Sequence, residues 1–300
     1  MFDVLGVGAC SIDYVYRLPD YPRPDGPSAK LRISSRTISP GGQTATVLCT
    51  CAALGLRTKY VGTVGNDDGG RRVREELMRR GVDLADLVER NGPNPYAVVL
   101  LDERQGERIV LWDRDDGLRL RPDDIRPEVI RSARLVHVDD VDAEAALRAA
   151  SLARSAGVRV TSDIEQVTEL TQRLVAAVDV PILAEHVPAA LTGEHDMERA
   201  LRAIRRGHAG LLCVTLGARG AMLLEGDHLY HEPAPRVKVV DTTGAGDVFR
   251  GAFIHALLRG DAPRDILRFA TTAAALSCTK PGAIGGVPTL EEATKSIGAI

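Results

Sequence analysis

The alternation of short apolar runs with amphipathic segments constrains the fold of this chain more than any other feature. Apolar runs of strand length lie at 2–9, 59–64, 135–138, 158–162 and 211–215. Segments with helical spacing lie among them at 44–54, 68–80 and 143–156. Strands and helices in this order predict right-handed β-α-β units and a mostly parallel sheet covered by helices on both faces. We therefore expect a three-layer α/β/α fold.

Two segments, 14–40 and 94–114, do not follow this rhythm. The first is rich in proline and then alternates polar and apolar residues at 30–34, which indicates a strand with one solvated face. The second contains two predicted strands, 96–101 and 108–112, on either side of a turn at 102–106, which is a β-hairpin pattern. We expect the two segments to form a small separate sheet, a lid over one edge of a single domain that spans 1–300.

Composition and charge exclude several classes of protein. The chain has 300 residues, of which 44% are hydrophobic, and a formal net charge of −3. The absence of a basic excess argues against partners such as nucleic acid or an anionic membrane. No basic N-terminal region precedes a long apolar run, and no apolar stretch is long enough to span a bilayer. The five cysteines lie mostly in apolar segments, which is typical of buried, reduced thiols and predicts a cytoplasmic protein.

The strongest chemical signal is the segment 241–253, Asp-Thr-Thr-Gly-Ala-Gly-Asp-Val-Phe-Arg-Gly-Ala-Phe. It follows an apolar run that ends at Val240, predicted as a strand, and it continues into a predicted helix that Gly260 ends. The Gly-Ala-Gly triplet at 244–246 therefore lies at a helix N-terminus, where unpaired N–H groups and the helix dipole bind anions. Asp247 follows in the first turn, where a carboxylate can take the proton of an attacking hydroxyl. An aspartate there can also simply complement the dipole, but the thirteen-residue context favours catalysis.

This segment resembles the C-terminal signature of the ribokinase-like carbohydrate kinases, also called the PfkB family. Three further stretches, at 41–46, 52–55 and 61–69, are similar to the N-terminal signature of that family; they read Gly-Gly-Gln-Thr-Ala-Thr, Ala-Ala-Leu-Gly and Val-Gly-Thr-Val-Gly-Asn-Asp-Asp-Gly. The resemblance covers nearly the whole chain and is nearest to the ketohexokinase and sulfofructose kinase branch. It implies a ribokinase-like fold and the phosphorylation of a small sugar, with ATP and Mg²⁺ as cofactors.

The resemblance also implies roles for individual residues. Asp247 would be the general base, and the anion hole would consist of Gly244, Ala245 and Gly246. The sugar pocket would be lined by Asp13, Gly42, Gln43 and Thr46. The ATP site would include Thr215, Gly217, Gly220 and Ala275. A monovalent cation such as K⁺ would lie near Asp241 and Thr243.

Two positions depart from the family pattern. Thr46 stands where the family often has asparagine, so one sugar contact is expected to differ. The family also often carries Asn-x-x-Glu, which organises magnesium through water, whereas residues 184–187 here are Ala-Glu-His-Val. Glu185 is the candidate that remains for the missing carboxylate.

We expect the acceptor to be a neutral ketose or pentose with a primary hydroxyl. An anionic acceptor would need cationic partners, and the candidates that sequence offers are Lys30, Arg32 and Arg114. Alternation places Lys30 and Arg32 on one face of the predicted strand. We also expect the lid to close over the sugar and to pair with a second copy in a homodimer, because its strands would otherwise leave open edges.

Two alternatives remain open. A nucleoside kinase of the same fold would need aromatic residues to stack a base, and the lid segments contain Tyr14, Tyr16, Tyr21, Tyr96 and Trp112. A non-catalytic sugar or nucleotide sensor is the other, although Asp247 and the complete Gly-Ala-Gly triplet argue against it.

Overall fold

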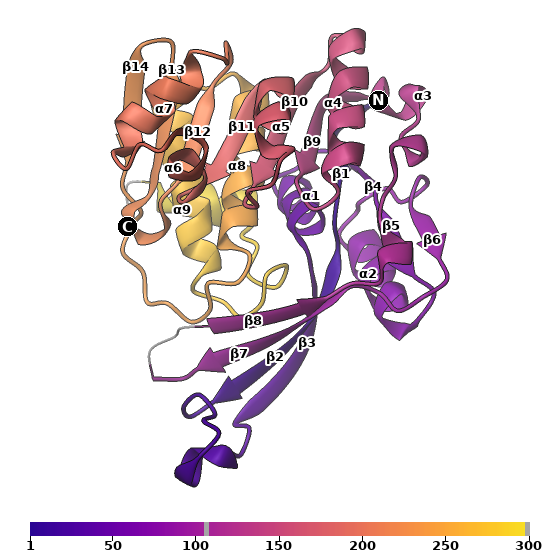
Figure 1. Cartoon of the computed structure of the whole chain (residues 1–300), viewed down its shortest axis with the longest axis vertical. Helices are drawn as coiled ribbons and strands as arrows, with labels where there is room; N and C mark the ends of the chain where they lie inside the picture. Colours follow the sequence, from indigo (N-terminus) through magenta and orange to yellow (C-terminus); the bar gives the residue numbers. More distant parts are fainter. Residues whose placement is uncertain (105–107, 298–300) are drawn as a thin grey trace.

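The computed structural model describes residues 1–104 and 108–297, within which an eight-stranded sheet forms the centre of the molecule (Figure 1). Across this sheet the strands are β14 (His228–Glu232), β13 (Ala221–Glu225), β12 (Leu212–Thr215), β11 (Val180–Ala184), β10 (Arg159–Ile164), β9 (Ala133–Asp139), β1 (Phe2–Val7) and β4 (Thr58–Val61). The strands from β12 to β4 run parallel, and β13 and β14 are antiparallel additions at one edge. The predicted α/β fold with a mostly parallel sheet is confirmed.

Helices cover both faces of this sheet and bury a separate apolar cluster on each (Figure 1). On one side lie α1 (Gln43–Ala53), α2 (Asp68–Arg79), α8 (Ala245–Arg259), α9 (Pro263–Ser277) and α10 (Leu290–Ser296). On the other lie α3 (Pro127–Ile130), α4 (Ala143–Ala156), α5 (Thr171–Ala177), α6 (Val187–Thr192) and α7 (Met197–Arg205). Within the described ranges, none of the helices combines the length and the apolar character that a membrane crossing requires.

A second sheet projects away from the main one and corresponds to the expected lid (Figure 1). In the described part of the chain this lid sheet consists of β3 (Ser35–Gly41), β2 (Ser11–Leu18), β7 (Tyr96–Asp102) and β8 (Arg108–Asp113), in that order. The hairpin strands β7 and β8 pair antiparallel as predicted, and β2 pairs parallel with β7. The turn predicted between β7 and β8 includes positions 105 and 106, which lie outside the described residues.

The strand predicted at 59–64 is divided in two. Its first half is β4 of the main sheet, whereas its second half, β5 (Thr63–Gly65), forms a separate two-stranded sheet with β6 (Val88–Arg90). A continuous apolar run cannot reveal such a change of partner, because each half is equally buried.

Two other predicted strands are wrong. Residues 30–34 are not a strand, because the partner β2 ends at Leu18 and the pairing with β3 stops at the register Arg17–Ser35. Lys30 and Arg32 therefore do not share a strand face, and their segment lies at the end of the lid that is farthest from the main sheet (Figure 1). The run ending at Val240 has no regular structure either, and Val239 and Val240 are 52% and 37% exposed. Residues of this run line a cavity and do not belong to a sheet.

Candidate active site

Helix α8 begins at the predicted anion-binding triplet. Gly244 is its N-cap residue and has a φ of 76°, a conformation that glycine adopts without strain. The helix continues to Arg259 and ends at Gly260, which is also left-handed. The first N–H groups of a helix have no carbonyl one turn earlier within it; in α8 the N–H of Ala245 makes a long bond of 3.3 Å to the carbonyl of Thr242. The start of α8 can therefore present N–H groups to an anion.

A cavity of about 910 Å³ opens beside this helix start. Its walls include the predicted nucleotide residues and two of the triplet, namely Thr215, Gly217, Gly220, Ala275, Ala245 and Gly246. The irregular segment 234–239 and the lid residue Arg108 also contribute to the lining. The structure thus brings together the residues that sequence assigned to ATP phosphates and ribose, in a space of the size that ligand pockets usually have.

Asp247 lies in the first turn of α8, partly buried, and carboxylates from other elements face it. Burial raises the pKa of Asp247 well above its usual range, while the charge of Arg250 acts in the opposite direction. Negative charge on Glu165, Asp139 and Asp13 raises this pKa further. An aspartate with a raised pKa is a stronger base than a free carboxylate, as a general base that works near neutral pH requires.

Asp13 lies on β2, where the lid sheet joins the main sheet, and its side chain is buried. Burial raises its pKa to about 6, and the hydroxyl of Ser11, which donates a hydrogen bond of 2.9 Å to Oδ1, opposes this rise. Asp241 also raises the pKa of Asp13, and Arg108 lowers it. Asp13 therefore lies within electrostatic reach of both the lid and the Asp-Thr-Thr-Gly segment.

The other predicted sugar residues lie at the start of α1. Gly42 is the N-cap residue with a φ of 96°, and a side chain there would collide with the backbone of Cys10 at 2.4 Å. Within the described ranges, the Oε1 atom of Gln43 and the hydroxyl of Thr46 are buried without hydrogen-bond partners. The amide oxygen can accept a hydrogen bond from a bound ligand, and the hydroxyl can either accept or donate one.

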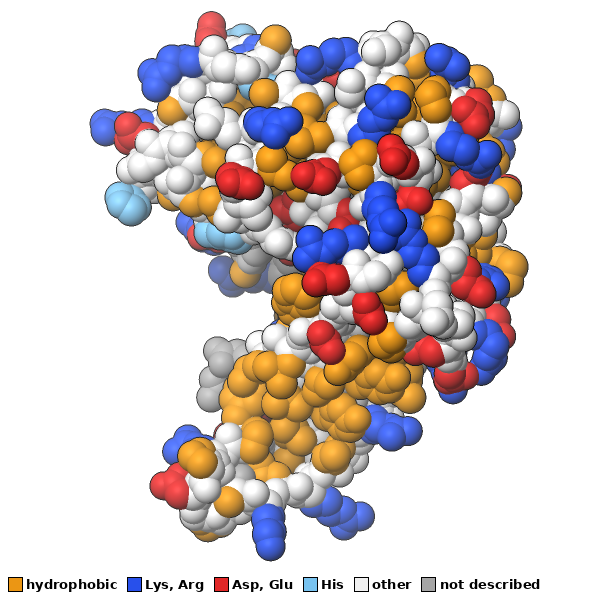
Figure 2. Space-filling model, turned by 45° about the vertical axis from the view of Figure 1, so that its right-hand side comes forward, with side chains coloured by type: hydrophobic (Ala, Val, Ile, Leu, Met, Phe, Trp, Pro, Cys, Tyr) orange, Lys and Arg blue, Asp and Glu red, His pale blue; other side chains and the backbone are white. Residues whose placement is uncertain are grey.

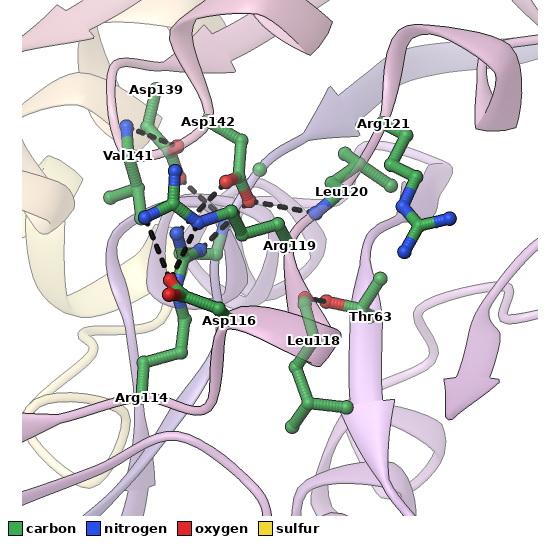
Figure 3. A network of polar contacts seen from close by, with 12 residues as sticks. Thr63, Arg114, Asp116, Leu118, Arg119, Leu120, Arg121, Asp139, Val141 and Asp142 are labelled. Carbon is green, nitrogen blue, oxygen red and sulfur yellow. Dashed lines mark hydrogen bonds and ion pairs between the residues drawn. The ribbon is translucent and has the colours of Figure 1, made fainter. Parts of the chain in front are cut away.

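Arg114 is engaged in an ion pair at the base of the lid. Its two terminal nitrogens donate to the carboxylate of Asp142, both at 2.9 Å, and the backbone N–H of Leu120 donates to the same group (Figure 3). Both charged side chains are largely buried. In this arrangement Arg114 joins the end of β8 to the start of α4, and both terminal nitrogens of its guanidinium are engaged by Asp142.

Asp241 ties the motif to the loop after α9. Its two oxygens accept hydrogen bonds from the backbone N–H groups of Thr243 and Gly282, each at 2.9 Å. The hydroxyl of Thr243 is buried and, within the described ranges, has no partner. The resemblance implies that this loop binds a monovalent cation, and an unpaired oxygen beside a carboxylate is compatible with that role.

Magnesium would have few protein ligands here. Among the described residues, no group of three His, Cys, Asp or Glu side chains could hold a metal ion. This is compatible with Mg²⁺, which retains several waters and takes one or two carboxylates together with substrate phosphates. Glu185, the candidate from sequence, is exposed beyond β11 and pairs with Arg219. A second carboxylate, Glu165, to which the sequence assigned no role, lies near the anion hole: a Cβ atom on Gly246 would be 3.9 Å from its Oε1.

Sequence reasoning missed Arg108 and Arg250. Arg108 begins β8 of the lid, and its Nη1 atom donates a hydrogen bond of 2.5 Å to the hydroxyl of Thr242. No local pattern could have indicated this contact, which joins residues 134 positions apart. Arg250 did carry a signal, since it is a charged residue within the buried and mostly apolar stretch 248–257.

Such a site suits the transfer of a phosphoryl group from a nucleotide to a hydroxyl, so fold and site together define a kinase. Comparison with known proteins gives the same class. The chain belongs to the pfkB family of carbohydrate kinases, whose family model matches residues 1–290. Membership makes it an ATP-dependent kinase and favours an enzyme over the non-catalytic sensor.

Individual relatives cover both sugar and nucleoside kinases. A nucleoside kinase of Methanothermobacter thermautotrophicus is 29% identical over 301 residues, which cover 98% of this chain and 94% of that protein. Probable fructokinase-4 of Arabidopsis thaliana is 30% identical over 281 residues, covering 85% and 86%. The structure of Arabidopsis thaliana ribokinase complexed with ribose and ATP superimposes with a TM-score of 0.85 at 26% identity, covering 99% of this chain and 98% of that one.

Proposed function

We propose that this chain transfers the γ-phosphate of Mg-ATP to the primary hydroxyl of a small sugar, a ketose or pentose. Asp247 acts as the general base, and the backbone N–H groups of residues 244–246 hold the phosphoryl group in transit. The chain works as a single kinase domain over 1–300, with lid segments at 14–40 and 94–114. The observation that carries this proposal is that Asp247 directly follows Ala245 and Gly246, which line the nucleotide-sized cavity, and is within electrostatic reach of the buried Asp13.

The roles follow from that placement. Asp13 on the lid side accepts hydrogen bonds from sugar hydroxyls, and Gln43 and Thr46 offer buried polar atoms to the same ligand. The charge of Asp13 reaches Asp247, so both carboxylates act on one bound acceptor. Asp247 removes the hydroxyl proton while the amides at the start of α8 stabilise the charge of the transferring group. Metal bound to ATP neutralises phosphate charge.

A neutral acceptor is favoured because the cations that sequence offered are not presented to Asp13. Arg114 is paired with Asp142, and the segment of Lys30 lies at the far end of the lid. Arg108 is different, because its charge reaches Asp13 and its guanidinium binds Thr242. An anionic acceptor would therefore be recognised through Arg108.

We expect fructose or ribose to give a higher kcat/KM than 2-keto-3-deoxygluconate or fructose 6-phosphate. Buried hydroxyl-binding groups discriminate against charged ligands, because burying an unpaired charge is costly and the guanidinium of Arg108 is already hydrogen-bonded to Thr242. A coupled assay of ADP release across these four acceptors measures the order. A preference for an anionic acceptor that Arg108→Gln abolishes and Arg104→Gln preserves would contradict this proposal; Arg104 is an exposed lid arginine paired with Asp20.

A nucleoside kinase is the second candidate, and one observation favours it. The rings of Tyr14 and Tyr96 lie edge to face on the lid with centroids 6.1 Å apart, which is an aromatic surface against which a base could pack. Adding adenosine, inosine and cytidine to the same acceptor panel separates the two functions. A nucleoside that outperforms every free sugar would assign the chain to the second.

We also propose that the lid sheet pairs with a second copy of this chain. Its edge strand β8 exposes apolar residues on both faces, and Trp112 is 72% exposed (Figure 2). Exposed apolar edge strands are usually covered in solution.

Light scattering should therefore give a dimer, and Trp112→Glu should convert it to a monomer, because the charge would be buried in the interface. Met78→Glu is the matched control, since Met78 is an exposed apolar residue of α2 outside the lid. A wild-type monomer would refute the dimer without affecting the kinase assignment.

A further inference from the structure

Arg250 is buried inside the helix that carries the catalytic base. It lies three residues after Asp247 on α8, and only 1% of its side chain is exposed. Its Nη2 atom lies 2.5 Å from Oδ1 of Asp163, which is fully buried at the end of β10, and 3.5 Å from Oε1 of Glu165. A buried ion pair therefore joins the catalytic helix to the central sheet.

The guanidinium also lies directly against the anion-binding triplet. A Cβ atom on Gly246 would be 2.6 Å from Nη1 of Arg250, which is closer than van der Waals contact allows. Gly246 thus leaves room for the cation as well as for a phosphate. Within the described ranges, Nε and Nη2 of Arg250 and both carboxylate oxygens of Asp163 make no hydrogen bond, so charge attraction at 2.5 Å and packing hold this side chain.

The charges around Asp247 come from every element that faces it, and Arg250 is the cation among the groups that shift its pKa. The negative groups are Asp163 of β10, Glu165 just after β10, Asp139 at the end of β9, and Asp13 of the lid. So many carboxylates favour a protonated Asp247, which cannot accept the hydroxyl proton. A nearby positive charge offsets them.

We propose that Arg250 is a positioning residue for phosphoryl transfer, whose buried guanidinium, held by Asp163, supports the 244–246 turn and offsets the carboxylates around Asp247. This inference rests on the proposed role of Asp247 as the base. It concerns a position within the motif to which the sequence pattern assigned no role.

The test is the pH dependence of kcat for Arg250→Met, measured with saturating Mg-ATP and the best acceptor. Loss of the cation raises the pKa of Asp247, and the base is active only when ionised. The acid side of the pH profile should therefore move to higher pH by about one unit or more. Arg250→Lys retains the charge and should leave the profile close to that of the wild type.

A second arm separates this role from support of the fold. Arg250→Met leaves Asp163 buried without its partner and should lower Tm, whereas Arg250→Met with Asp163→Leu replaces the whole pair by apolar groups and should recover Tm. The profile of the double variant should be shifted less than that of Arg250→Met, because Asp163→Leu removes a negative charge that acts on Asp247 in the opposite direction. Arg90→Met is the matched control; it breaks a largely buried ion pair with Asp124 and should lower Tm without moving the profile.

Three results would overturn the inference: an unmoved profile in Arg250→Met, an equal shift in Arg250→Lys, or an equal shift in the control Arg90→Met. Each requires an active kinase, so each leaves the proposed function standing. If the wild-type protein phosphorylated none of the acceptors, the proposed function itself would fail.

Discussion

Replacing Asp247 by asparagine is expected to lower kcat by at least about 10²-fold while folding and ATP binding remain nearly intact. The amide has the shape of the carboxylate but cannot accept the hydroxyl proton, and general base catalysis typically contributes roughly 10²–10⁴-fold. Steady-state assays give kcat, calorimetric titration gives ATP affinity, and thermal unfolding reports the fold. A variant that kept more than about a tenth of the wild-type kcat would exclude Asp247 as the base.

The matched control is Asp68→Asn. Asp68 also lies in the first turn of a helix, α2, but it is exposed and pairs with Arg71 and Arg72. If Asp247 only complemented the helix dipole, both substitutions would have small effects on stability and none on turnover. A large loss of kcat in Asp247→Asn with wild-type turnover in Asp68→Asn supports catalysis by Asp247.

Removing divalent metal is expected to lower turnover by at least about 10²-fold, because a bound ion supplies several kcal/mol of charge stabilisation. In-line transfer requires the charge on the ATP phosphates to be neutralised. The test compares initial rates with excess MgCl₂ and with excess EDTA, followed by restoration with MgCl₂. Activity that excess EDTA leaves undiminished would refute the need for metal.

Two variants then ask which carboxylate helps to hold magnesium. We expect Glu185→Ala to raise the Mg²⁺ concentration needed for half-maximal rate, because the exposed ion pair of Glu185 with Arg219 is weak and easily exchanged. Glu165→Gln serves as the comparison, since Glu165 lies beside Gly246. An effect in Glu165→Gln alone would assign magnesium binding to that residue.

The monovalent-cation loop at Asp241 and Thr243 is tested by measuring the initial rates of the wild-type protein with K⁺ replaced by tetramethylammonium.

Local patterns were sufficient for the sheet and for the catalytic helix. The triplet at 244–246 and Asp247 were placed correctly at the start of α8, because glycine conformation and helix termini depend on nearby residues. The predicted helix at 143–156 matches α4 (Ala143–Ala156) for the same reason. The separate lid sheet was also indicated, since its segments break the α/β rhythm.

Local patterns did not predict which strands pair with each other or which charged side chains pair. The run ending at Val240 is as apolar as a strand, yet it lines the cavity, and residues 30–34 alternate like a strand, yet β2 has already ended. Both errors arise because an apolar or alternating pattern describes the side chains alone, whereas a strand also needs a neighbouring strand to bond. That neighbour can be anywhere in the chain.

The sequence by itself determined the α/β class, the segments of the separate sheet and the glycine-rich start of α8 with its aspartate, because each depends on spacing within a few turns or strands. Only the tertiary structure decided that Arg114 joins Asp142, that Arg108 reaches Thr242 and that Arg250 is held by Asp163. These contacts join residues 28, 134 and 87 positions apart, and a long charged side chain carries no local mark of its partner. The physical reason is that charge pairing is fixed by the space that folding creates, after the backbone pattern has been set.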